Sequence, residues 1–209
     1  MTYSRTYWRI APECAVPTDG QLIQVTQGEP PLSVVDALFH LRIDAGIEDD
    51  LVESLIRSIQ NELEPPNGWL GRALTTSEYK QTLPYFARRI KLAGAPIQSI
   101  DAVTYRDSSG TVQTVDPSFY RLTDGAAPML VLEPNKEWPT DLECTPDAVS
   151  IEYTAGFGAN DTSVPEIIKQ YIRIMVGYRY DVRKPTVIGT IVAPNPYVRD
   201  MLESWRVRL

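Results

Sequence analysis

The chain is poor in the residues that build metal centres and has no stretch that could cross a membrane. Its 209 residues include one histidine and two cysteines. Cys14 and Cys144 lie far apart, with neither a CxxC pair nor a histidine partner, which excludes a zinc site of the usual spacing. No window approaches the ~20 apolar residues that a membrane-spanning helix needs. Because no apolar segment follows the N-terminus, we expect no signal peptide, and two reduced thiols in a protein made in the cytoplasm.

Positive charge is also scarce. The chain carries 20 basic and 27 acidic side chains, a net charge of -7, and no basic run exceeds two residues. Binding to DNA without regard to sequence requires clustered Lys and Arg that neutralise phosphates, so that class of function is excluded. An acidic surface would instead let DNA slide past without adsorbing.

Catalytic signatures are missing. His40 is the only histidine and has no Ser-His-Asp arrangement around it. Gly156-Phe157-Gly158 is not followed by the GK[ST] of a phosphate loop, so we expect a tight turn between a strand and a helix. The acids at 48–50 lack the spacing of a calcium loop. We therefore expect no enzyme, no catalytic residue, no bound metal and no cofactor.

Two amphipathic helices are predicted between Ser33 and Pro65. Ser33 is a typical helix cap, and Asp36 supplies the acid of a capping box. The residues 44–46, Asp-Ala-Gly, separate the helices, and the acids at 48–50 favour the N-terminus of the second. Apolar residues then recur at helical spacing: Leu51, Val52, Leu55, Ile56, Ile59 and Leu63. Pro65-Pro66 ends the helix. Such a hairpin needs another element to cover its apolar faces.

Short alternating runs from about Glu78 to Thr154 predict a small antiparallel β unit. Strands are expected over 97–105 and 111–115, joined by a turn at 107–110. Further strands are expected over 119–122, 129–133 and 149–154. In the last of these, apolar and polar residues alternate most regularly.

A third long helix is predicted from Pro165 to Val182, with Ser163 as its cap. Its apolar face is expected to comprise Ile167, Ile168, Tyr171, Ile172, Met175 and either Tyr178 or Arg179. A helix of this length would be the central packing partner of the helical hairpin.

The end of the chain offers surfaces for a partner. The apolar segment from Thr186 to Ala193 would be an aggregation risk if bare, so we expect it to lie against another chain or to form an edge strand. A short helix is expected over 196–209, with Trp205 and Arg206 on opposite sides. Tryptophan and arginine are enriched where interfaces concentrate their binding energy. Packing of this helix on its own domain is an equal alternative.

These elements predict an α+β fold, with a small helical core (a two-helix hairpin, a long third helix and a C-terminal helix) and an inserted antiparallel β unit. We expect an N-terminal extended arm at 1–30 and a helical core at 31–77 and 160–183. The inserted β unit would occupy 78–159, and a C-terminal arm with a docking helix would occupy 184–209.

Two blocks of sequence resemble the head–tail connector (adaptor) proteins of tailed bacteriophages. The first block comprises Pro31-Leu32-Ser33 leading into the helical segments 37–44 and 49–56, and then residues 71–75, Gly-Arg-Ala-Leu-Thr. The second comprises residues 153–158, Tyr-Thr-Ala-Gly-Phe-Gly, followed by 164–168, Val-Pro-Glu-Ile-Ile. The resemblance lies in the order and spacing of these motifs.

The resemblance implies a virion structural protein, made in the host cytoplasm, that acts as an adaptor in the neck. Its copies would form a homo-oligomeric ring of about twelve beneath the portal protein. The ring would join the capsid vertex to a stopper or tail protein, while genomic DNA passes through the lumen without specific binding. Candidate contacts with the portal or a neighbouring copy are Val187, Ile188, Ile191, Val192, Tyr197, Leu202, Trp205, Arg206 and Arg208.

Two other interpretations stay open at this point. The chain could be a different neck part, such as a stopper or a tail-completion protein. In a different class, the β unit could bind a small ligand or a glycan on a helical scaffold. A concave cluster formed by the strand aromatics would favour that interpretation; these are Tyr105, Phe119, Tyr120 and Tyr153.

Overall fold

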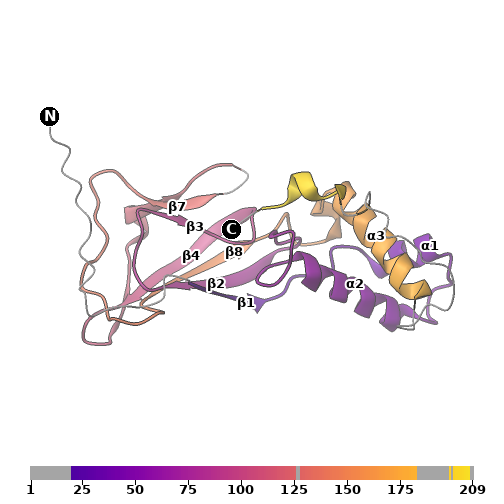
Figure 1. Ribbon diagram of the computed structural model, residues 1–209, viewed down its shortest axis with the longest axis horizontal. Coiled ribbons are helices and arrows are strands. Elements are labelled where there is room, and N and C mark those ends of the chain that lie inside the picture. Colours follow the sequence, from indigo (N-terminus) through magenta and orange to yellow (C-terminus); the bar gives the residue numbers. More distant parts are fainter. Residues whose placement is uncertain (1–19, 126–127, 183–197, 199, 208–209) are drawn as a thin grey trace.

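The computed structural model describes residues 20–125, 128–182, 198 and 200–207. Strands occupy one end of an elongated molecule and helices occupy the other (Figure 1). The described part of the chain contains three α-helices and two antiparallel sheets, of five and three strands. The predicted α+β class is confirmed. No helix in this part of the chain has the length and apolar character needed to cross a membrane.

The helical half consists of α1 (Val34–Leu41), α2 (Asp49–Leu63) and α3 (Glu166–Asp181). The predicted cap of α1 is confirmed, because the Ser33 hydroxyl accepts a hydrogen bond of 3.2 Å from the Asp36 amide. Between α1 and α2 the chain turns through Gly46, whose φ is +88°. At about 1.5 Å per residue, α3 is roughly 24 Å long. It packs on both members of the hairpin.

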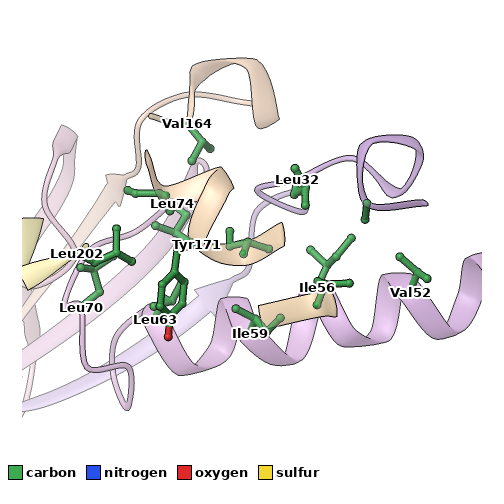
Figure 2. Close-up of a cluster of buried hydrophobic side chains, with 14 of the residues drawn as sticks. Leu32, Val52, Ile56, Ile59, Leu63, Leu70, Leu74, Val164, Tyr171 and Leu202 are labelled. Carbon is green, nitrogen blue, oxygen red and sulfur yellow. The ribbon is translucent and has the colours of Figure 1, made fainter. Parts of the chain in front are cut away.

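The side chains buried between these helices form one apolar cluster, called here the helical core (Figure 2). From α2 the cluster takes Val52, Ile56, Ile59 and Leu63, and from α3 it takes Ile168, Tyr171, Ile172 and Val176. Leu32, Leu70, Leu74 and Leu202 close it from other segments. Each such side chain stabilises the fold by about 1.5–3 kcal/mol on burial.

The apolar faces of α2 and α3 are narrower than the sequence predicted. Leu51 is 38% exposed, because it lies about one hundred degrees around α2 from the buried Val52. Tyr178 is 60% exposed for the same kind of reason, since Val176 is the buried residue of that turn. Leu51 was wrongly expected to face the core, and of the two residues expected at the end of the α3 face, Tyr178 does not face it.

The cap of α3 also differs from the expectation. The carbonyl of Pro165 accepts hydrogen bonds from the amides of Ile168 and Lys169, at 2.9 and 3.2 Å. Pro165 is therefore the N-cap residue, and Ser163 lies before it in a short 3-10 turn, η2 (Asp161–Ser163). The prediction of Ser163 as the cap was wrong, because the helix begins at Pro165 without a side-chain cap.

The larger sheet has the strand order β1-β2-β8-β4-β5 and is antiparallel throughout. These strands are β1 (Gln21–Thr26), β2 (Ser77–Leu83), β8 (Val149–Ala155), β4 (Ile97–Arg106) and β5 (Val112–Thr114). The smaller sheet has the order β3-β7-β6. Its strands are β3 (Arg89–Lys91), β7 (Met129–Leu132) and β6 (Tyr120–Leu122). The predicted hairpin is confirmed, with the Gly110 amide donating to the Asp107 carbonyl at 2.8 Å.

The β half has its own core, at the centre of which Tyr79 and Tyr153 stack with ring centroids 5.8 Å apart. The hydroxyl of Tyr153 donates to the carbonyl of Ala93 at 3.0 Å, which satisfies its polar tip inside the core. As predicted, β8 buries alternate residues, namely Val149, Ile151, Tyr153 and Ala155.

Part of the expected N-terminal arm belongs to this sheet. Residues Gln21–Thr26 form β1, which pairs with β2. β1 is therefore an edge strand of the larger sheet. Residues 1–19 lie outside the described part of the chain.

The cysteine prediction was wrong. Cys144 is disulfide-bonded, so the chain does not carry two reduced thiols. Cys14 lies outside the described residues. Separation along the chain says nothing about whether two sulfur atoms can meet in space, which depends on a Cα separation of a few ångströms.

A buried carboxyl lies where the two halves meet. Glu64, which is 2% exposed, follows the last residue of α2. Its Oε1 accepts a hydrogen bond of 2.8 Å from the Leu74 amide, and its Oε2 accepts a longer one of 3.4 Å from Gln24 in β1. Burial raises the pKa of Glu64, and these hydrogen bonds offset only part of that effect.

Replacement of Glu64 by Gln is expected to change how stability depends on pH. The folded-state pKa lies above the ordinary value of 4.5, so the folded chain binds this proton more tightly than the unfolded chain does. The resulting stabilisation is present below the unfolded pKa and is lost as pH rises through the folded pKa. Glu64→Gln keeps an acceptor for the Leu74 amide but removes the titration. Urea unfolding should therefore show the variant gaining stability relative to the wild type as pH rises above the ordinary carboxyl pKa of 4.5. A difference that does not vary with pH would contradict this account.

Candidate interaction surfaces

The C-terminal segment lies against the segment that follows α2. Leu202 is fully buried in the helical core, and the Val207 amide donates to the Leu70 carbonyl at 2.9 Å. The contact is close at Gly71, where φ is +70° and a Cβ atom would lie 2.4 Å from the Val207 carbonyl oxygen. Only glycine combines that backbone conformation with that close approach.

Trp205 is half-buried on the surface of its own domain. Its ring meets the edge of Phe157 at a centroid distance of 6.2 Å, and the Arg72 guanidinium lies 5.9 Å from its centroid. Arg72 also donates a hydrogen bond to the Trp205 carbonyl. The next residue, Arg206, is exposed and forms only a loose ion pair of 3.9 Å with Glu203. Trp205 and Arg206 thus present adjacent accessible surface on an anchored segment.

The predicted interface residues fall into three groups. Leu202 serves the core of its own domain, as the alternative of self-packing expected. Trp205 and Arg206 lie side by side in sequence on the outside of that core, with Val198 also partly buried against it. The remaining candidates, Val187, Ile188, Ile191, Val192, Tyr197 and Arg208, lie outside the described residues. Of the helix expected over 196–209, residues 198 and 200 are helical and residues 203–205 form a 3-10 turn.

An exposed apolar face on α1 was not predicted from the sequence. Val35 is 74% exposed and Phe39 is 86% exposed, on the side of α1 opposite the buried Ala37 and Leu38. A signal was available, because two large apolar residues four positions apart share a helix face. The buried residues of α1 form a second apolar pattern that obscured it.

An ion-pair network fixes α1 on α3. The Arg173 guanidinium of α3 contacts the Asp36 carboxylate at 2.8 Å and also pairs with Glu166. Its side chain is only 16% exposed, so solvent screens the pair less than it would on an open surface. An open hollow of about 840 Å³ lies beside this pair, and Phe39, His40 and Arg42 contribute to its lining.

The strand aromatics pack inside the β half. Trp138 stacks on Phe86 with centroids 4.6 Å apart and on Tyr120 at 6.3 Å, while Tyr105 meets the edge of Phe86 at 6.0 Å. The Trp138 indole N–H donates to the Ala87 carbonyl at 3.1 Å. These rings are therefore used for internal packing.

Within residues 20–125, 128–182, 198 and 200–207, no three side chains of His, Cys, Asp or Glu gather closely enough to hold a metal ion. His40 lies exposed on α1, at the hollow.

No family model matches the chain, and no curated protein is similar to it. Several solved structures, however, are similar to it. A chain in the neck of an empty gene transfer agent (GTA) particle, computed with C6 symmetry, is 25% identical with a TM-score of 0.72. The match covers 90% of this chain and 97% of that chain. The virion of the native gene transfer agent particle gives the same values. The neck of the native GTA particle computed with C12 symmetry matches over the same shares at 25% identity, with a TM-score of 0.68. These neighbours confirm the resemblance to phage head–tail connector proteins.

Proposed function

We propose that this connector-type chain is a structural protein of a virion neck, and specifically the head–tail adaptor. Its copies form a ring below the portal, join the capsid vertex to the next neck or tail component, and let DNA pass. One observation carries the proposal: the match to a neck chain extends over 90% of this chain and 97% of the other. The likeness therefore includes the β half as well as the helical hairpin.

Ring formation has support from the neighbours, since their necks were computed with C6 and C12 symmetry. In a cyclic ring each copy uses one surface to contact the copy before it and a different surface to contact the copy after it. A net charge of -7 suits a component that DNA passes without adsorbing.

The internal packing of the β-half aromatics favours the adaptor over a glycan-binding module. A glycan site needs exposed rings in a concave arrangement, whereas Phe86, Tyr105, Tyr120 and Trp138 contact one another. A neck part on the tail side, such as a stopper, would assemble in the neck in the same way as the adaptor. Contact with the portal separates these two roles.

The neck assignment is tested by locating the protein in purified particles. A histidine tag on the chain is labelled with nickel–gold and the particles are viewed by electron microscopy. Gold is expected at the junction of head and tail. Gold along the tail tube or at its tip, with none at the junction, would overturn the proposal.

Arg206→Ala is expected to weaken attachment to the portal about tenfold without affecting the fold, because interfacial arginines often contribute more than 1 kcal/mol. Trp205→Ala should act in the same direction. The matched control is Arg121→Ala, which removes an arginine with a 58% exposed side chain from the β half. Binding is measured by co-sedimentation with the portal ring, and folding by thermal melts. If Arg206→Ala binds as the wild type does, this segment is not the portal contact.

A further inference from the structure

Large exposed apolar side chains gather at the helical end of the molecule. Within the described residues, that half exposes Val35, Phe39, Ile47, Leu51, Tyr178 and Val182. Clusters of this kind on a soluble protein mark surfaces that contact another molecule. Val35, Phe39 and Ile47 belong to α1 and the turn that follows it, Leu51 belongs to the first turn of α2, and Tyr178 and Val182 lie at the end of α3.

The first surface, called here the α1 face, consists of Val35, Phe39 and Arg42. Arg42 ends α1 in a left-handed conformation, with φ +59°, and is exposed. It forms no ion pair with any residue that the structure describes. The hollow described above opens next to Phe39 and Arg42 and has room for an aromatic ring.

The second surface, called here the α3 face, consists of Tyr178, Asp181 and Val182. Tyr178 and Val182 are 60% and 39% exposed, and Asp181 lies between them in sequence, exposed and without an ion pair to a described residue. Asp181 and Val182 follow Tyr178 by three and four residues, so the three side chains lie on one side of α3 at its C-terminal end.

The two faces point in different directions. Gly177, like Arg173 one turn before it, faces α1, because a Cβ atom at Gly177 would lie 3.8 Å from His40 Nε2. Tyr178 follows Gly177 and is therefore rotated by about 100° around α3, away from α1. Phe39 points out of α1, because the opposite side of α1 packs on the helical core.

We propose that the α1 face of one copy of this chain packs against the α3 face of the next copy. The inference rests on the proposed ring and identifies the surfaces that close it. Each face has an apolar pair and one charged residue without an ion pair to a described residue, and the two charges have opposite sign, so Arg42 of one copy meets Asp181 of the next. Asp44 also lines the hollow, so the uncharged Tyr178, and not Asp181, enters it. Tyr178 fits the hollow beside Phe39, since its apolar ring and polar tip suit a mixed lining.

Because the two faces differ, the contact is heterologous and closes only after a full turn of copies. Three residues on each copy are far fewer than the roughly 20–30 per partner of a stable interface. The contact is therefore weak between two free copies and effective when many copies are held together on a template.

The test counts the copies that join the portal ring, using light scattering over a range of protein concentrations. Arg42→Glu and Asp181→Arg each place like charges opposite one another and are expected to raise the concentration needed for a full ring at least tenfold. The chain with both changes restores opposite charges and should assemble as the wild type does. Arg89→Glu makes the same charge change on an exposed residue of β3 and should have no effect.

The outcomes separate this inference from the proposed function. If the wild type forms no ring with the portal, the adaptor proposal fails before the faces are tested. If the wild type forms rings and both single variants do so equally well, the ring stands and these faces are not its contacts. Single variants that fail without rescue in the double variant also exclude the Arg42–Asp181 pairing. Phe39→Ser should reproduce the loss without lowering the melting temperature, since the ring is 86% exposed.

Discussion

Gly156→Ala is expected to lower the free energy of unfolding by about 3 kcal/mol or more, because backbone strain and overpacking act together at this position. Gly156 follows β8 with a φ of +133°, and a Cβ atom there would lie 2.3 Å from the carbonyl oxygen of Thr75. The obstacle is backbone, so it cannot rotate away. Hydrogen bonds hold the two segments together, including one of 2.9 Å from the Thr76 amide to the Gly158 carbonyl.

Gly110→Ala is the matched control for that change. Gly110 has a φ of +80°, but a Cβ atom there would meet nothing within 4 Å. It therefore carries only the cost of the left-handed backbone, about 1 kcal/mol. Chemical denaturation of both variants measures the difference. Equal losses for the two would show that the approach of residues 156–158 to residues 74–76 does not constrain the fold.

Leu202→Ala is expected to cost about 2–4 kcal/mol, the range for removing a fully buried leucine side chain. Leu202 is the described residue through which the C-terminal segment enters the helical core, and its exposure is 0%. The loss should appear as a lower midpoint in urea with an unchanged slope.

Arg206→Ala provides the contrast within the same segment. Arg206 is exposed, so its removal should change stability by no more than about 0.5 kcal/mol. Stability and portal binding should therefore be separable along the segment, with Leu202 affecting the first and Arg206 the second. A Leu202→Ala variant as stable as the wild type would mean that the C-terminal segment is not part of the core.

Local chemistry explains which elements were predictable. The cap at Ser33, the break at Gly46 and the alternation in β8 depend on residues close together in sequence, and each was predicted. Ser163 was misassigned because a hydroxyl near a proline is a local signal for a cap, while the Pro165 carbonyl served instead.

Exposure was harder to predict, because it depends on what covers a residue in three dimensions. Leu51 and Tyr178 fit the helical period but lie at the margins of their stripes, where no element of the described residues covers them. The exposure of Val35 and Phe39 was not predicted, because α1 carries apolar residues on two sides and only one side is buried. The disulfide at Cys144 likewise depends on a contact that sequence spacing does not encode.

The candidate interface was predictable only in part. The sequence indicated that the C-terminal residues carry a tryptophan and arginines, and the structure places Trp205 and Arg206 on an anchored surface. The α1 and α3 faces needed the structure, because they are defined by what α1, α2 and α3 leave uncovered after packing on one another.

The central claim, a ring-forming adaptor on the portal, is tested most directly by mass. Light scattering of the purified protein, first alone and then with the cognate portal ring, gives the number of copies bound. The account predicts that the protein joins the portal in a fixed number of copies set by the symmetry of the ring. A protein that leaves the mass of the portal unchanged at saturating concentration would contradict the adaptor role and move the chain to the tail side of the neck.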